Sequence, residues 1–227
     1  MKTLKQNFYS VRSQIHQAEM MGGRANDSVK LIAVSKTKPA KDIATLHQLG
    51  QQDFGENYLQ EALEKQQQLA TLNLIWHFIG PIQSNKTKAI AENFSWVHSV
   101  ERLKIAQRLS HQRPAHLPPL NICLQVNISN EPTKSGVDLQ ALPSLITEVN
   151  ALENIRLRGV MAIPAPETDY DLQCQPYRKL YQQIKALNLS TLDTFSFGMT
   201  GDLNAAVAEG STMIRIGTAL FGKRVKP

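Results

Sequence analysis

The chain has 227 residues, of which 42% are apolar and 19% charged, and it carries a formal net charge of +6. This length suits one large domain or two small ones, and the composition is ordinary for a globular protein. No apolar run approaches the roughly eighteen residues that a membrane-spanning helix needs. The charged start of the chain leads into no apolar region, so we expect neither a membrane association nor a secretory signal.

The basic residues are scattered, and no aromatic platform accompanies them, so nucleic-acid binding is only a weak alternative. A small phosphorylated ligand would explain the positive charge equally well. Cys123 and Cys174 lie far apart without CxxC spacing, which predicts two ordinary thiols in a reducing cytoplasm. The six histidines show no metal-binding spacing, so we expect no protein-bound metal.

The order of elements follows from hydrophobic spacing. Residues 4–21, closed by Gly22 and Gly23, predict a leading helix. After it, short apolar stretches alternate with segments of helical spacing, such as 43–49, 139–149 and 180–187. The predicted strands are residues 31–34, 52–54, 75–79, 95–98, 121–127, 156–163, 194–197 and 213–216.

Alternating strands and helices predict parallel strands with right-handed crossovers. Eight such units favour an α/β fold, a single (β/α)8 TIM barrel with an extra N-terminal helix, forming one domain over residues 1–227. A doubly wound open sheet is the alternative. That fold would want a glycine-rich turn after the first strand, where this sequence has Ser35-Lys-Thr-Lys38.

Barrels of this kind form their sites at the carboxyl ends of the strands, and phosphate commonly binds after strands seven and eight. Those two loops contain Thr200, with a glycine on either side, and the pair Gly217-Thr218. Glycine allows close backbone approach, threonine supplies a hydroxyl, and a following helix offers free N–H groups. The glycines alone could serve tight turns, but their presence in both loops predicts a phosphate site.

Lys36 follows the first strand, which closes the barrel beside the eighth, so it should face the same mouth as Arg215. Taken alone, Lys36 and Lys38 are simply solvated loop residues. A lysine, a phosphate cradle and an arginine together predict a pyridoxal 5'-phosphate site, with the Schiff base on Lys36. An arginine against the ring nitrogen would disfavour its protonation. Lys38 either raises the local positive potential or is solvated.

Five motifs make the sequence recognisable: Ile32-Ala-Val-Ser-Lys-Thr37, Phe54-Gly-Glu-Asn-Tyr58, Trp76-His-Phe-Ile-Gly-Pro-Ile-Gln-Ser-Asn-Lys86, Ser196-Phe-Gly-Met-Thr200 and Ile214-Arg-Ile-Gly-Thr-Ala-Leu-Phe-Gly222. In this order they closely resemble the pyridoxal phosphate homeostasis protein family. The resemblance spans essentially the whole chain. It implies a barrel like the N-terminal domain of alanine racemase, in a cytoplasmic binding protein with no demonstrated catalysis.

The resemblance also implies roles for single residues. Lys36 would carry the cofactor, Arg215 would face the pyridine nitrogen, and Asn57 would line the pocket. The phosphate would be held by Thr200, Gly217 and Thr218. Thr200 stands where the family usually has serine, which keeps the hydroxyl. Lys134 matches a further family lysine thought to bear on cofactor handling.

Two classes of function suit this site. A carrier would hold pyridoxal 5'-phosphate and pass it to apo-enzymes, and we expect such a protein to be a monomer. A racemase would need a second base on the other face of the substrate carbon, and the sequence offers no domain after the last strand to supply it. A Schiff-base aldolase would use similar loops but would leave Arg215 without a ring to contact. His77 and His98 are predicted to be core histidines.

Overall fold

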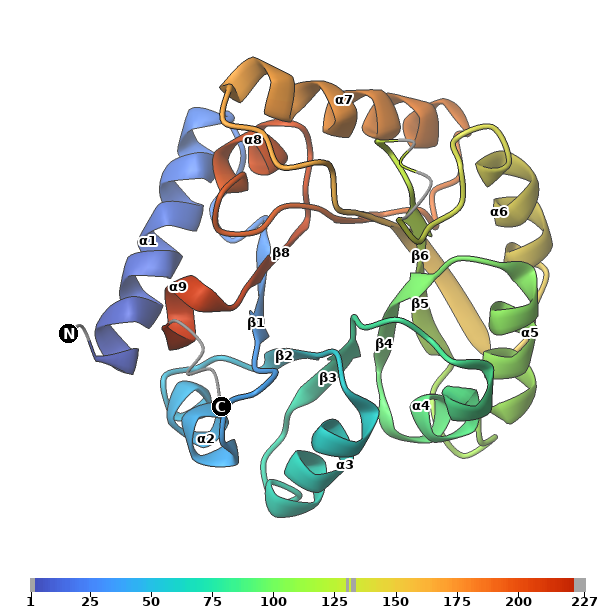
Figure 1. Ribbon diagram of the computed structural model, residues 1–227, viewed down its shortest axis with the longest axis horizontal. Coiled ribbons are helices and arrows are strands. Elements are labelled where there is room, and N and C mark those ends of the chain that lie inside the picture. The colour runs from blue at the N-terminus through green and yellow to red at the C-terminus, as the bar shows by residue number, and fades with distance from the viewer. Residues whose placement is uncertain (1–2, 130, 132–133, 223–227) are drawn as a thin grey trace.

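The part of the chain that the computed structural model describes, residues 3–129, 131 and 134–222, forms eight parallel strands that close into a barrel (Figure 1). The strands are β1 (Lys30–Val34), β2 (Asp53–Glu56), β3 (Ile75–Phe78), β4 (Trp96–Val100), β5 (Leu120–Val126), β6 (Ile155–Ala162), β7 (Thr194–Ser196) and β8 (Met213–Ile216). Strand β1 pairs with both β2 and β8, which closes the sheet. The predicted barrel is confirmed.

Helices surround the barrel, and those that follow β1 connect successive strands, except for the last, which follows β8 (Figure 1). They are α2 (Ala40–Gln48), α3 (Leu59–Gln68), α4 (Thr87–Asn93), α5 (Leu103–Gln112), α6 (Leu142–Asn150), α7 (Tyr170–Ala186), α8 (Leu203–Ala208) and α9 (Thr218–Phe221), with a short 3-10 turn at Ser84–Lys86. The predicted leading helix is α1 (Leu4–Met21), which packs against α8 and α9. Thr3 and Gln6 close its start as a capping box.

The predicted strands differ from the observed ones by one or two residues at one or both ends, except for β8, and for the second strand the difference has a physical reason. The second strand was expected at residues 52–54, but β2 runs over Asp53–Glu56 and is buried at all four positions. Polar Glu56 belongs to this buried strand because Ser35 and Lys65 supply hydrogen bonds to its carboxylate. Hydrophobic spacing alone does not indicate a strand that ends in a charge.

The core has two parts. Most buried apolar side chains form one cluster that includes residues of the strands and of the helices, and a fully buried Leu, Ile, Val or Phe contributes about 1.5–3 kcal/mol. The second, smaller cluster is Ile32, Trp96, Cys123, Met161 and Met213. It is small because polar side chains occupy much of the barrel interior. Within the described residues, no helix has the length and apolar character needed to cross a membrane.

Candidate functional site

Lys36 lies at the carboxyl end of the barrel, where it shares a small cavity of about 30 Å³ with Gly217 and Thr218. The two segments meet there because β1 and β8 are neighbours, with Ala33 opposite Ile216. The remaining residues that line the cavity are Val34, Lys38 and Gly222. Three of the six predicted site residues therefore lie together.

Lys36 sits in a tight turn between Ser35 and Lys38, in which the Lys38 amide donates to the Ser35 carbonyl at 3.0 Å. The Lys38 side chain crosses to the other loop, where its Nζ donates to the carbonyl oxygens of Phe221 (3.1 Å) and Gly222 (3.4 Å). Of the two roles considered for Lys38, simple solvation is therefore wrong. Lys38 ties the turn after β1 to the end of α9.

Gly217 and Thr218 form the start of α9, with Gly217 at the N-cap position. The first amides of a helix have no partner within it, so they are available to an anion. The backbone of Gly217 has a negative φ of −114°, and a Cβ built there would only reach ordinary contact with Val34. Glycine is therefore not required at this position by the protein's own packing.

Arg215 extends from β8 into the barrel interior and is only 4% exposed. Its Nη1 donates to both the carbonyl and the Oγ of Ser196, the latter at 2.7 Å, and Nη2 donates to the Ala162 carbonyl at 3.2 Å. Burial lowers the pKa of the guanidinium. No carboxylate among the described residues forms an ion pair with it. A buried cation of this kind favours an electron-rich partner.

Two histidines extend the hydrogen bonds of Arg215 and Ser196 across the barrel interior. The Ser196 hydroxyl lies 2.8 Å from His98 Nδ1, and His98 Nε2 lies 2.9 Å from His77 Nδ1. His77 Nε2 in turn lies 2.9 Å from the carboxylate of Asp53. One arrangement of protons satisfies every contact: Arg215 donates to Ser196, Ser196 to His98, His98 to His77 and His77 to Asp53. Both imidazoles are neutral in that arrangement.

The electrostatics agree with neutral imidazoles. Both rings are fully buried, and burial lowers the pKa of His77 and, more strongly, that of His98. Burial acts to raise the pKa of Asp53, but the hydrogen bond from His77 and the charge of Lys30 hold it below its ordinary value. The Lys30 ammonium lies 3.2 Å from Asp53. The prediction that His77 and His98 are hydrogen-bonded core histidines is confirmed.

Asn57 follows β2 and lines a cavity of about 420 Å³, together with residues at the ends of β3 to β6. Its Oδ1 is buried and accepts no hydrogen bond from the protein. Gly80 is required beside it, since a Cβ on Gly80 would lie 2.1 Å from the Asn57 carbonyl oxygen. Lys134 lines the same cavity and forms an ion pair with Glu131 at 2.7 Å.

Thr200 lies apart from this group. It is exposed in the loop between β7 and α8 and lines a different cavity, beside Gln14 and Gln17 of α1. Asp202 stands at the N-cap position of α8 without a side-chain capping bond. Its carboxylate instead accepts from the Met199 amide and the Tyr177 hydroxyl, both at 2.6 Å.

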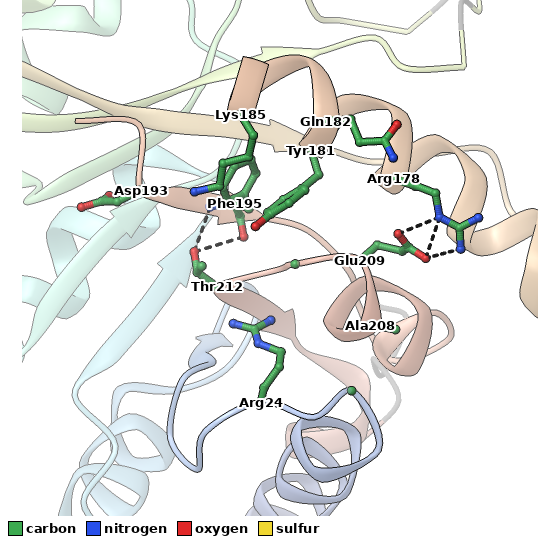
Figure 2. Close-up of a pocket in the computed structure, with 12 residues that line it drawn as sticks. Arg24, Arg178, Tyr181, Gln182, Lys185, Asp193, Phe195, Ala208, Glu209 and Thr212 are labelled. Atoms are coloured by element: carbon green, nitrogen blue, oxygen red, sulfur yellow. Dashed lines mark hydrogen bonds and ion pairs between the residues drawn. The ribbon is translucent and has the colours of Figure 1, made fainter. Parts of the chain in front are cut away.

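A larger cavity of about 510 Å³ opens at the opposite end of the barrel, around the starts of β7 and β8 (Figure 2). Its charged groups already have partners: Arg178 pairs with Glu209 at 2.6 Å, and Arg24 donates to the carbonyls of Val207 and Ser211. In barrels of this type the amino ends of the strands serve stability rather than chemistry. The carboxyl end therefore remains the candidate site.

Comparison with known proteins shows the family of this chain. A family model described as the alanine racemase N-terminal domain matches residues 10–225. The pyridoxal phosphate homeostasis protein of Pseudomonas aeruginosa is 57% identical over 224 residues, which cover 99% of this chain and 97% of that protein. This chain belongs to the pyridoxal phosphate homeostasis protein family. The member from Escherichia coli K12 is 48% identical over 229 residues, covering 99% and 98% of the two chains.

A solved structure extends the likeness to three dimensions. PipY of Synechococcus elongatus PCC7942, with PLP bound, superimposes with a TM-score of 0.79 at 35% identity. The match covers 92% of this chain and 100% of PipY.

Sequence reasoning gave no role to Ser196, although it opens one of the motifs quoted above. The feature of the sequence that could have indicated a role is its hydroxyl, because it lies in the short apolar strand before the glycine-containing loop. Glu61 and Lys65 on α3 were likewise missed, since charges on a helix ordinarily indicate a solvated face. Their contacts with the turn around Lys36 depend on the packing of α3 against β1 and β2.

Proposed function

We propose that this chain binds pyridoxal 5'-phosphate and acts in its intracellular homeostasis, holding the cofactor on Lys36 and buffering or supplying it. The observation that carries the proposal is the shared cavity of Lys36, Gly217 and Thr218, in which Gly217 lies two residues after the buried Arg215. Membership of the homeostasis family and the PLP-bound relative PipY support it.

The residues present suit this cofactor. A phosphate group favours a hydroxyl, helix-start amides and nearby cations, and Thr218, the first turn of α9 and Lys38 in the same cavity provide them. A pyridine nitrogen favours a donor, which the buried Arg215 guanidinium offers. The orphaned Oδ1 of Asn57 borders a cavity with room for a ligand of this size. The donor set therefore fits the group.

Each residue has a distinct task in this proposal. When bound, the cofactor would supply an aldehyde, and Lys36 would hold it through its side-chain amine, with loss of one water. Thr218 and the amides of α9 bind the phosphate, and Gly217 lets the backbone approach it. Arg215 donates to the ring nitrogen and disfavours its protonation. Asn57 borders the pocket, and Thr200 is assigned to the phosphate from the neighbouring loop, although it lies outside the cavity that Lys36 and Thr218 share.

A carrier suits the site better than a racemase does. A racemase needs a second base on the opposite face of the reacting carbon. Besides Lys36, the titratable residue that lines the small cavity is Lys38, and its Nζ is directed to the carbonyls of Phe221 and Gly222. The larger cavity adds Glu101 and Lys134, and Lys134 forms an ion pair with Glu131. Arg215 beside the ring nitrogen would also weaken the electron sink that racemisation uses.

The remaining parts of the proposal concern the whole protein. We propose one cofactor-binding domain over residues 1–227, acting as a monomer in the cytoplasm and delivering pyridoxal phosphate to apo-enzymes. The closed barrel, whose strands run from Lys30 to Ile216, supports the single domain. Both cysteines, Cys123 and Cys174, are free and buried, which is typical of a reducing compartment.

Titration of the purified protein with pyridoxal 5'-phosphate tests the proposal. We expect a saturable visible absorption band, which Lys36→Ala abolishes while retaining weaker, non-covalent binding through the phosphate. Exposed Lys41→Ala serves as the control and keeps the band. Absence of the band from the wild-type protein, or its full retention in Lys36→Ala, would overturn the proposal.

A further inference from the structure

We propose that the ion pair between Lys65 and Glu61 on α3 is a clamp that positions Lys36. This inference rests on the proposed function of Lys36. It assigns a role to two charged residues of α3 that do not line the cofactor cavity.

The two halves of the ion pair hold the two peptide units on either side of Lys36. Lys65 Nζ donates to the Ser35 carbonyl oxygen at 2.7 Å, which fixes the peptide unit before Lys36. The Thr37 amide donates to Glu61 Oε1 at 2.6 Å, which fixes the peptide unit after it. Lys65 Nζ itself lies 2.6 Å from Glu61 Oε1. The backbone on both sides of the Lys36 Cα is thereby constrained.

Burial makes this arrangement firm. The side chain of Lys65 is only 6% exposed, and its three N–H donors are directed to Ser35, Glu61 and Glu56. Glu56 is fully buried and also accepts from the Ser35 hydroxyl at 2.7 Å. Charge-assisted bonds in a buried setting are stronger and better ordered than those at the surface. Every group that Lys65 contacts is itself held in place.

The backbone of the turn needs such support. Thr37 has a φ of +63°, a left-handed conformation that is unfavourable for a β-branched residue. The bond from its amide to Glu61 is one of the contacts that hold this conformation. A turn released from the clamp would lose its strained geometry, and Lys36 would sample directions away from the cavity it shares with Thr218.

A glutamate on the same helix provides a matched control. Glu61→Ala removes the acceptor for Thr37, whereas Glu64→Ala makes the same chemical change at an exposed position that accepts from the Gln60 side-chain amide at 3.2 Å. Glu61→Gln keeps an oxygen that can accept from the Thr37 amide. Glu61 is about a quarter exposed, so these variants should fold, and melting curves identify the temperature range in which each is native.

Two measurements test the clamp on folded protein. The first is amide hydrogen exchange of Thr37 without cofactor, which we expect to accelerate about tenfold in Glu61→Ala, as for the loss of one charge-assisted hydrogen bond. The second is the affinity for pyridoxal 5'-phosphate from the visible band, which should fall about tenfold in Glu61→Ala. Glu61→Gln should recover most of both effects, and Glu64→Ala should match the wild type.

The outcomes separate the clamp from the proposed function. Wild-type exchange and wild-type affinity in folded Glu61→Ala would overturn the clamp while leaving the cofactor on Lys36. A lowered melting temperature accompanied by unchanged affinity would also overturn it, because the pair would then serve stability only. If the wild-type protein itself binds no pyridoxal 5'-phosphate, the proposed function fails. Faster exchange of the Thr37 amide in Glu61→Ala would then show only that Glu61 orders the turn after β1.

Discussion

The hydroxyl of Ser196 lies 2.7 Å from Nη1 of Arg215, and it is the link through which the buried guanidinium reaches His98. The hydroxyl accepts from the arginine and donates to the imidazole, so neither contact depends on a change of proton position. Arg215 is therefore oriented by the barrel interior before any ligand arrives. Such preorganisation favours binding because the side chain has little orientational freedom left to lose on association.

Ser196→Ala tests this link. The variant keeps the Ser196 carbonyl as an acceptor but removes the hydroxyl from between Arg215 and His98. We expect the affinity for pyridoxal 5'-phosphate to fall about tenfold, with the visible band still formed on Lys36. The exposed Ser144→Ala on α6 is the control. Wild-type affinity in Ser196→Ala would show that the orientation of Arg215 does not depend on the hydroxyl.

The neutral histidine pair predicts how stability depends on pH. Burial lowers the folded-state pKa of His77 and His98, whereas the unfolded chain takes up protons near pH 6.5. The unfolded state then binds more protons, so the stabilisation is fully present above about pH 6.5 and is lost as the pH falls toward the folded-state pKa values. Each histidine contributes a slope of up to about 1.4 kcal/mol per pH unit.

Urea unfolding at several pH values measures this slope. His98→Gln should reduce the slope below about pH 6.5 by up to about 1.4 kcal/mol per pH unit, whatever its effect on absolute stability. The exposed His116→Gln is the control and should leave the slope unchanged. An unchanged slope in His98→Gln would mean that the ring is protonated in the folded protein, contrary to the hydrogen-bond arrangement.

The two threonines assigned to the phosphate should differ. Thr218 shares the cavity of Lys36, whereas Thr200 is exposed and lines a cavity beside α1. Thr218→Val should weaken pyridoxal 5'-phosphate binding about tenfold and leave pyridoxal, which lacks the phosphate, unaffected. Thr200→Val should have the smaller effect. Equal losses for both aldehydes in Thr218→Val would show that its hydroxyl does not recognise the phosphate.

Gly80 should be a sensitive glycine near the mouth. A methyl group at this position would lie 2.1 Å from the Asn57 carbonyl oxygen, so Gly80→Ala should lower the free energy of unfolding by about 1–3 kcal/mol and displace Asn57. Gly201→Ala is the comparison, because its Cβ would meet nothing within 4 Å and should change stability by less than about 0.5 kcal/mol. Thermal unfolding of both variants gives the difference, and equal stability would contradict the close approach.

The fold could be predicted because its signal is periodic. The apolar stretches from Leu31 to Ile216 alternate with helical segments, and their order alone indicates the barrel and the meeting of Lys36 with Thr218 beside β8. Local sequence could not separate Thr200 from that group. Both threonines follow glycine-rich turns, and only the path of the loop after β7 carries Thr200 toward α1.

The supporting contacts were beyond sequence reasoning for a different reason. Lys65 lies 30 positions from Ser35, and His98 lies 98 positions from Ser196, so their partners are determined by closure of the barrel rather than by spacing. The sequence alone also does not distinguish a buried lysine from a lysine at the surface. Only the packing of α3 against β1 and β2 distinguishes Lys65 from its solvated neighbours.

The most direct test of the account is to locate the bound cofactor. Purified protein saturated with pyridoxal 5'-phosphate is reduced with borohydride, digested and mapped by mass spectrometry. The account predicts one dominant label, on the peptide that contains Lys36, with little on Lys38 or Lys65. A dominant label on another lysine, or none on Lys36, would contradict the central claim that the strand leading to Lys36 exists to present that amine to the cofactor.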